Sequence, residues 1–148
     1  CFHKRYILGD KTAFKSKDFN NWTEVHDYLV KEEKAVLIFP LYLYGHSGLS
    51  IKIGSYNGLL PQGHAEFDSG QVGFIYITKD KLKSEGLNKK NAEQSLKYEV
   101  ETYNQYLTGD VYSIVKETYN RDKEQLDYEV IGGYFGYDYA LKSLETEI

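Results

Sequence analysis

The stretch Phe67-Asp68-Ser69-Gly70-Gln71-Val72-Gly73-Phe74-Ile75-Tyr76-Ile77 decides how the chain is organised. Its second half, from Val72 to Ile77, carries no charge and is rich in β-branched and aromatic residues. That pattern predicts a central strand buried on both faces. Its first half is small and polar, with a carboxylate, a hydroxyl and an amide where the strand begins. A rigid strand next to a polar loop is a common way to hold a site, and also a common way to begin a strand.

Apolar and alternating runs on either side predict further strands. Residues 35–44 form a long apolar run interrupted only by Pro40, which lacks a backbone N–H and therefore predicts an unpaired or bulged edge. Clean alternation over residues 49–53 predicts a half-exposed strand, joined to the first by a turn at residues 45–48. Two more strands around a polar turn are predicted at residues 110–119 and 125–131.

Helical periodicity predicts four helices. Asn21-Trp22-Thr23-Glu24 has the pattern of a capping box. The helices are expected at about residues 21–33, 79–85, 90–107 and 137–147. Strand pairs and helices in separate blocks favour an α+β fold. We expect one mainly antiparallel sheet of about five to six strands, with the helices packed mostly on one face.

Size and composition limit the class of protein. The 148 residues predict a single domain, 1–148, large enough for a real core. The net charge of −4 argues against a broad nucleic-acid surface, and no apolar run has membrane-spanning length. With one cysteine, Cys1, no internal disulfide forms, which predicts a reducing compartment such as the cytoplasm.

Two polar turns are candidates for a ligand site. His46 and Ser47 place an imidazole and a hydroxyl side by side, although neighbours on a turn rarely form a nucleophile–base pair, and a plain turn is the simpler interpretation. Asp68, Ser69 and Gln71 offer an acceptor, a hydroxyl and an amide to a polar ligand. A turn held by an Asp side chain explains the same residues equally well.

His64, Glu66 and Asp68 share one face if the segment is extended, and they could then bind a metal. The segment reads equally as a loop, and carboxylates are common surface residues. We therefore expect no metal at these residues. We also expect no cofactor, and we assign no catalytic residue.

Further candidates lie on the longest helix and in the last glycine-rich segment. Glu99, Glu101 and Gln105 lie off the apolar stripe of the helix, where a solvated face is the simpler explanation. Tyr134, in a glycine-punctuated segment, could stack on a base, although a tight strand-to-helix turn is the simpler explanation.

Three segments together carry a family resemblance: residues 40–48 (PLYLYGHSG), 68–76 (DSGQVGFIY) and 99–112 (EVETYNQYLTGDVY). A fourth, at residues 133–138 (GYFGYD), fits as well. The chain resembles an uncharacterised family of small proteins of bacteriophages and mobile elements. Gly45 stands where the family pattern has Asp, and Phe67 stands where it has Trp. The family has no activity to transfer, so the resemblance implies only a phage or prophage accessory protein in a bacterial cytoplasm.

Together these features lead us to expect a non-catalytic anti-defence binding protein. It would capture a small polar, nucleotide-like ligand or act as an acidic inhibitor that blocks a host defence protein. The alternative is a small hydrolase or nucleotide-processing enzyme that uses His46 as general base with Asp68 or Glu101. No membrane partner is expected. The Tyr-rich composition and the edge at Pro40 permit a homodimer.

Overall fold

The structure, a computed structural model, describes residues 1–46, 48–58 and 69–147. It divides the chain into two compact units, Cys1–Asn104 and Gln105–Ile148. The boundary falls within the last helical turns of α4 (Lys89–Thr108). Each unit is described below by itself.

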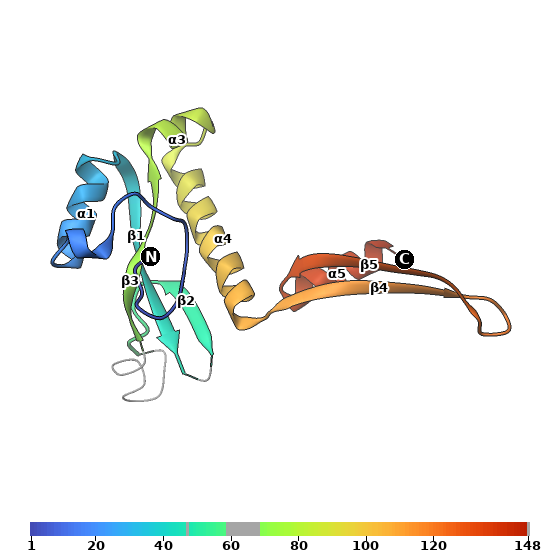
Figure 1. Cartoon of the computed structure of the whole chain (residues 1–148). Helices are drawn as coiled ribbons and strands as arrows, with labels where there is room; N and C mark the ends of the chain where they lie inside the picture. The colour runs from blue at the N-terminus through green and yellow to red at the C-terminus, as the bar shows by residue number, and fades with distance from the viewer. Residues whose placement is uncertain (47, 59–68, 148) are drawn as a thin grey trace. The chain divides into compact units, whose positions relative to one another are not determined.

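A three-stranded antiparallel sheet forms the centre of the first unit (Figure 1). Its order is β2 (Leu49–Ile53), β1 (Ala35–Gly45) and β3 (Ser69–Thr78). The predicted hairpin of β1 and β2 is confirmed, with Gly45 opposite Leu49. The prediction that β3 is central is wrong, because β1 lies between the other two strands and β3 is at an edge.

Pro40 lies at the point where pairing on one side of β1 ends. The ladder with β2 stops at Leu41 and Ile53, and beyond it the Gly54 N–H donates to the Pro40 carbonyl at 3.0 Å. A proline has no N–H to give to a further β2 residue, so the ladder ends where the sequence removes the donor.

Helices cover both faces of this sheet, which corrects the expectation that they pack mostly on one face. Helix α1 (Trp22–Lys31) lies on one side, where the rings of Trp22 and His26 contact Phe74 at 6.0 and 5.8 Å. Side chains alternate along β3, so Ile75 and Ile77 lie on the face opposite Phe74. On that face, Ile77 forms a buried cluster with Ala92 and Leu96 of α4. Figure 1 shows α1 and α4 flanking the sheet.

Short local signals set the helix boundaries in this unit. The Asn21 side chain accepts the Glu24 N–H at 2.9 Å, which confirms the predicted cap of α1. Thr78 caps α3 (Lys79–Ser84) by accepting the Lys81 N–H. The Asn88 side chain accepts the Asn91 N–H at 2.8 Å in the first turn of α4.

The N-terminal arm, residues 1–15, packs along β3 before a short 3-10 helix, η1 (Ser16–Asp18). The Phe2 N–H donates to the Val72 carbonyl at 2.6 Å. A Cβ added at Gly73 would lie 2.9 Å from Cys1 Cα, so only glycine allows this approach. The arm therefore covers part of the outer edge of the sheet.

The second unit is a long hairpin with one helix. Strands β4 (Val111–Tyr119) and β5 (Gln125–Phe135) pair antiparallel and are followed by α5 (Tyr137–Glu147). The described strands thus form two antiparallel sheets of three and two strands, and the predicted single sheet of five to six strands is wrong. The α+β class and the four predicted helices are confirmed. Among the described residues, no helix is long and apolar enough to cross a membrane.

Candidate functional site

The sheet brings the two predicted polar turns to one end. The register places Ser69 opposite Tyr44, two residues before His46, and Gln71 opposite Tyr42. The His46 side chain is exposed, and its ring lies 6.1 Å from that of Tyr44. The side-chain amide of Gln71 donates to the Gly73 carbonyl of the same strand at 3.4 Å, so this donor already has a partner within β3. Ser47 and Asp68, like His64 and Glu66, lie outside the described residues.

On α4 the predicted acidic candidates are not the residues that contact this end of the sheet. Glu99 and Glu101 are both exposed, on either side of the buried Val100. Asn104, which the sequence analysis did not single out, contacts β2 instead. Its Oδ1 accepts the Ile51 N–H at 2.8 Å and the Ser50 hydroxyl at 3.1 Å. Its position four residues after Val100 is the helical spacing that could have identified it.

Tyr56 adds a further contact to the hydrogen bonds between Asn104 and β2. Its hydroxyl lies 2.9 Å from the Ser50 hydroxyl, and its side chain is buried. Burial raises the pKa of Tyr56 above its usual range, although the hydrogen bond with Ser50 acts in the opposite direction. The phenol therefore stays protonated at neutral pH. The cluster of Ser50, Tyr56 and Asn104 joins elements of the fold and leaves few polar atoms for a ligand.

The last two predicted ligand residues belong to the second unit. Tyr134 lies in β5, with its ring 5.8 Å from that of Tyr139. Gln105 lies against Gly136, where an added Cβ would meet its Nε2 at 2.8 Å. Both side chains are half-buried and take part in packing within that unit.

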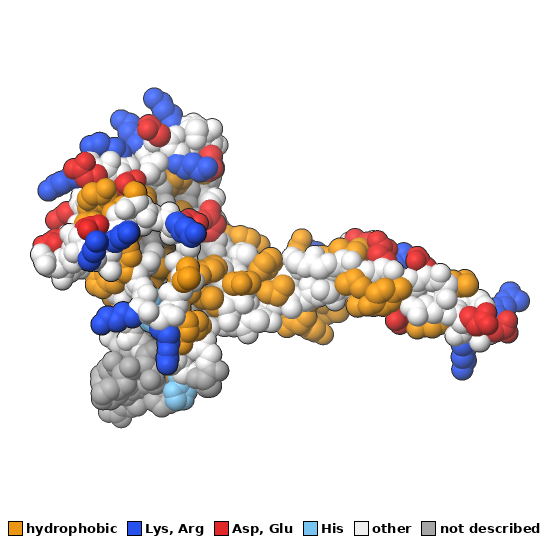
Figure 2. Space-filling view, viewed as in Figure 1, with side chains coloured by type: hydrophobic (Ala, Val, Ile, Leu, Met, Phe, Trp, Pro, Cys, Tyr) orange, Lys and Arg blue, Asp and Glu red, His pale blue; other side chains and the backbone are white. Residues whose placement is uncertain are grey.

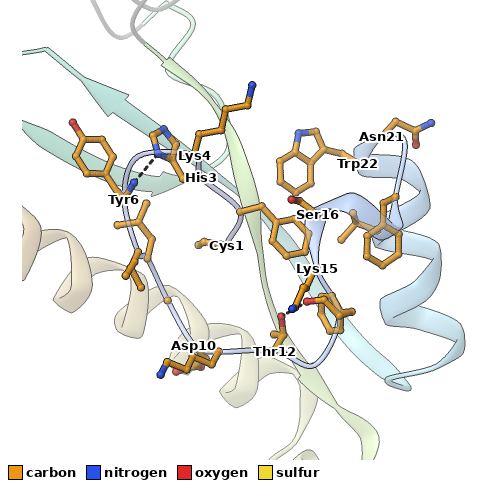
Figure 3. Close-up of a pocket in the computed structure, with 18 of the residues that line it drawn as sticks. Cys1, His3, Lys4, Tyr6, Asp10, Thr12, Lys15, Ser16, Asn21 and Trp22 are labelled. Atoms are coloured by element: carbon orange, nitrogen blue, oxygen red, sulfur yellow. Dashed lines mark hydrogen bonds between the residues drawn. The ribbon is translucent and has the colours of Figure 1, made fainter.

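A concavity of the first unit lies elsewhere, in the N-terminal arm and the start of α1 (Figure 3). This depression, called here the arm pocket, has a volume of about 940 Å³ and is lined entirely by residues between Cys1 and Val25. Figure 3 shows the arm looping around Cys1, with Trp22 and Asn21 of the α1 region on one side. A volume of this size is within the usual range for small-molecule sites.

One wall of the arm pocket is a cluster of aromatic rings. Phe2 lies nearly parallel to Trp22, with centroids 6.0 Å apart and planes 14° apart. Phe2 is also stacked with Phe19 at 6.4 Å, and Phe14 meets Phe2 edge-on at 6.1 Å. All four rings line the pocket and are half-buried. They hold the arm onto α1 and leave part of a flat apolar wall facing solvent.

The rim of the arm pocket is basic. Lys4, Lys11 and Lys15 line it with a single acidic residue, Asp10, whereas the whole chain has a net charge of −4. His3 shapes the rim, because its Nδ1 accepts the N–H groups of Arg5 and Tyr6, each at 3.1 Å. With Nδ1 accepting, a neutral His3 ring carries its proton on Nε2, and that group is a donor.

Cationic side chains beside a flat apolar wall can bind an anion that carries a ring. Lysine ammonium groups pair with phosphate or carboxylate, and aromatic walls pack against planar apolar groups. In the part of the chain that the structure describes, no group of three or more His, Cys, Asp or Glu side chains could hold a metal ion. Lysine side chains beside an aromatic wall can supply binding and orientation of such a ligand.

The arm pocket was missed because its parts look unremarkable in the sequence. Lys4 and Arg5 beside His3 form a small basic group that a solvated terminus explains more simply than an anion site does. The aromatic residues Phe2, Phe14 and Phe19 follow neither helical nor strand periodicity, so pattern analysis does not group them. Only the fold of the arm onto β3 brings them together.

Comparison of the chain with protein-family models, with curated proteins and with solved structures gave no match in any of the three cases.

Proposed function

We propose that this chain is a non-catalytic binding protein that captures a small anionic, nucleotide-like ligand in the arm pocket. The observation that carries this proposal is the combination of three rim lysines and one rim carboxylate with an aromatic wall in a depression of about 940 Å³. Capture of such a ligand was expected from the sequence, but at the motif residues around His46. The proposal moves the site to the N-terminal arm.

Charge and shape together favour a phosphorylated or carboxylated ring over other ligand classes. A free phosphate would pair with the lysines but leave the aromatic wall exposed to water. An uncharged ring would pack on the wall but leave the lysines without an anionic partner. A mononucleotide uses both, because its base can pack on the wall and its phosphate can reach the rim. The excess of basic side chains also raises the local concentration of anions in an otherwise acidic protein.

The biological setting is part of the proposal. The four motif segments resemble small phage and mobile-element proteins, which supports a phage or prophage accessory protein acting on a bacterial host. In that setting, a protein that captures a nucleotide signal would act against host defence. The proposed anti-defence role rests on this resemblance together with the character of the pocket.

The hydrolase alternative requires a carboxylate that works with His46. Asp68 lies outside the described residues, and Glu101 is an exposed residue of α4. Hydrolysis stays a prediction, and the same experiment that tests capture also tests it.

Thermal-shift and calorimetric titrations with AMP, a cyclic dinucleotide, adenosine and inorganic phosphate test the proposal. We expect AMP or the cyclic dinucleotide to raise the melting temperature, with adenosine and phosphate each binding at least roughly tenfold more weakly. Mass spectrometry of the recovered ligand should find it intact. A chemically changed ligand would support the enzyme alternative.

Lys15→Gln and Lys17→Gln form a matched pair for the site. Lys15 lines the arm pocket, whereas Lys17, two residues away in η1, does not. We expect Lys15→Gln to weaken nucleotide binding by roughly three- to tenfold, since one charged hydrogen bond is lost, and Lys17→Gln to leave it unchanged. Equal effects of the two variants, or no binding of any nucleotide, would refute the arm pocket as the site.

A further inference from the structure

The hairpin of the second unit has two unlike faces. The cross-strand pairs Ile114–Ile131, Lys116–Glu129 and Thr118–Asp127 lie on one face. Helix α5 covers the base of this face, where Ile114 is buried and the rings of Tyr112 and Tyr137 meet at 5.6 Å. The pairs between them, Ser113–Gly132, Val115–Val130 and Glu117–Tyr128, lie on the opposite face. We call this second surface the ribbon face.

The ribbon face carries several exposed apolar side chains. Val115 and Val130 are each 50% exposed and Tyr128 is 58% exposed, although valine and tyrosine are residues that sheets normally bury. Leu126 and Tyr119, beside the bulge near the hairpin turn, are also exposed. Figure 2 shows hydrophobic side chains along the length of this unit, with charged ones beside them and at its tip.

A two-stranded ribbon of this kind needs cover. An isolated hairpin is marginally stable in water, and each strand of a two-stranded sheet leaves one edge unpaired. Along the whole of β4 and β5, Ile114 is the only buried hydrophobic residue among those the structure describes. A partner that covers the ribbon face would supply the missing apolar contact.

Charge indicates which partner fits. The unit Gln105–Ile148 contains nine Asp and Glu and four Lys and Arg, a formal net charge of −5, whereas Cys1–Asn104 has 13 acidic and 14 basic residues. On the ribbon face itself, the one charged residue of the three pairs is Glu117. A second copy would bring two strongly acidic ribbons together, and nucleic acid or an anionic membrane would be repelled.

We propose that the ribbon face is a docking surface for a protein partner that offers apolar side chains surrounded by lysine and arginine. The valine and tyrosine side chains would supply the buried contact, and the acidic surroundings would steer the basic partner and fix its orientation. This surface is separate from ligand capture in the arm pocket, so either proposal can fail without the other.

Two matched peptides test the chemistry directly. Both carry the same core of alternating valine and tyrosine; one is flanked by lysines and the other by glutamates. Fluorescence anisotropy with the full chain should show binding of the lysine-flanked peptide at low salt, weakened by roughly tenfold or more in 0.5 M salt. The glutamate-flanked peptide should not bind.

Variants locate the contact on the ribbon face. The double variant Tyr128→Thr with Val130→Thr removes apolar surface but keeps good strand formers, and we expect it to weaken peptide binding by roughly thirtyfold or more. Lys116→Thr, on the opposite face, is the matched control and should bind at least as tightly as the wild type, because it makes the unit more acidic. Circular dichroism confirms that each variant is folded.

Several results would overturn the proposal. Equal binding of the two peptides, binding of neither, or unchanged binding by the double variant would each do so. Light scattering adds a separate test, because a wild-type dimer that the double variant dissociates would show that a second copy covers the ribbon face.

Discussion

Gly73 lies where the N-terminal arm comes closest to β3. A methyl group there would lie 2.9 Å from Cys1 Cα and 3.3 Å from Cys1 N, and both are backbone atoms that cannot simply rotate away. We therefore expect Gly73→Ala to displace the arm and to lower the free energy of unfolding by about 1–3 kcal/mol, as overpacking does. Urea unfolding measures the loss, and weaker nucleotide binding would follow because the arm forms the pocket.

Gly70 is the matched control for this prediction. It lies in the same strand, and an added Cβ would meet nothing within 4 Å. Gly70→Ala should leave stability unchanged or raise it by about 0.4–1 kcal/mol, because alanine restricts the unfolded chain. If both variants were equally destabilised, the close approach of the arm to Gly73 would not be the cause.

Glu24 makes the stability of α1 depend on pH. The Asn20 N–H donates to its carboxylate at 2.8 Å, and the Asn20 side chain donates at 3.2 Å. These bonds, the backbone one first, hold the pKa of Glu24 below its usual value. Because the folded pKa is lowered, the added stability is present above the ordinary carboxyl pKa and is lost as pH falls through the lowered value.

The expected outcome is a stability difference between the wild type and Glu24→Gln that shrinks as pH falls from 6 to 3. Urea midpoints across this range measure it. Glu32→Gln, at the opposite end of the same helix, serves as the control and should not reproduce the trend. A constant gap between wild type and Glu24→Gln would show that the carboxylate charge is not involved.

At the scale of elements, Asn104 joins α4 to the outer edge of β2. The Ile51 N–H points away from β1, and the Asn104 side chain accepts it. Asn104→Ala should leave this partly buried N–H without its acceptor and cost about 1–3 kcal/mol in the free energy of unfolding. Hydrogen exchange at Ile51 should accelerate together with the loss of stability.

Two further variants distinguish the loss of this hydrogen bond from the general effect of a substitution in α4. Gln94→Ala changes an exposed residue of α4 and should alter stability by no more than about 0.5 kcal/mol. Asn104→Asp keeps an acceptor oxygen and should preserve the slow exchange at Ile51 better than alanine does. An alanine variant with unchanged exchange at Ile51 would contradict the proposed link.

The elements themselves were largely predictable because their signals are local. The cap at Asn21, the apolar stripe through Ala92, Leu96 and Val100, and the alternation of β2 each lie within one stretch of sequence. Strand order depends on contacts between distant stretches. The uncharged run of β3 indicated burial on both faces, but it is equally compatible with an edge strand that the N-terminal arm covers.

At the scale of the whole molecule, sequence patterns did not reveal the division into two units or the arm pocket. The second hairpin was predicted correctly, but its alternation does not show whether its strands join a larger sheet. The candidate residues from Ser69 to Tyr134 were chosen as polar or aromatic members of motifs, and the structure distributes them over both units. The register does place Ser69 opposite Tyr44, so the turn after β1 and the polar start of β3 lie at the same end of the sheet.

The difference between the two sheets leads to a prediction for the free protein. Strand β1 pairs with β3 along most of its length and with β2 from Leu41 to Gly45, and helices cover both faces, so the amides of this paired half open only with much of the first unit. Strands β4 and β5 have one partner each and an exposed apolar face, so their amides should exchange roughly a hundredfold faster than those of β1 in dilute solution. Adding the lysine-flanked peptide should slow exchange in β4 and β5 but not in β1. Slow exchange in the free, monomeric protein would mean that the ribbon is stable without a partner, and it would remove the physical reason for expecting one.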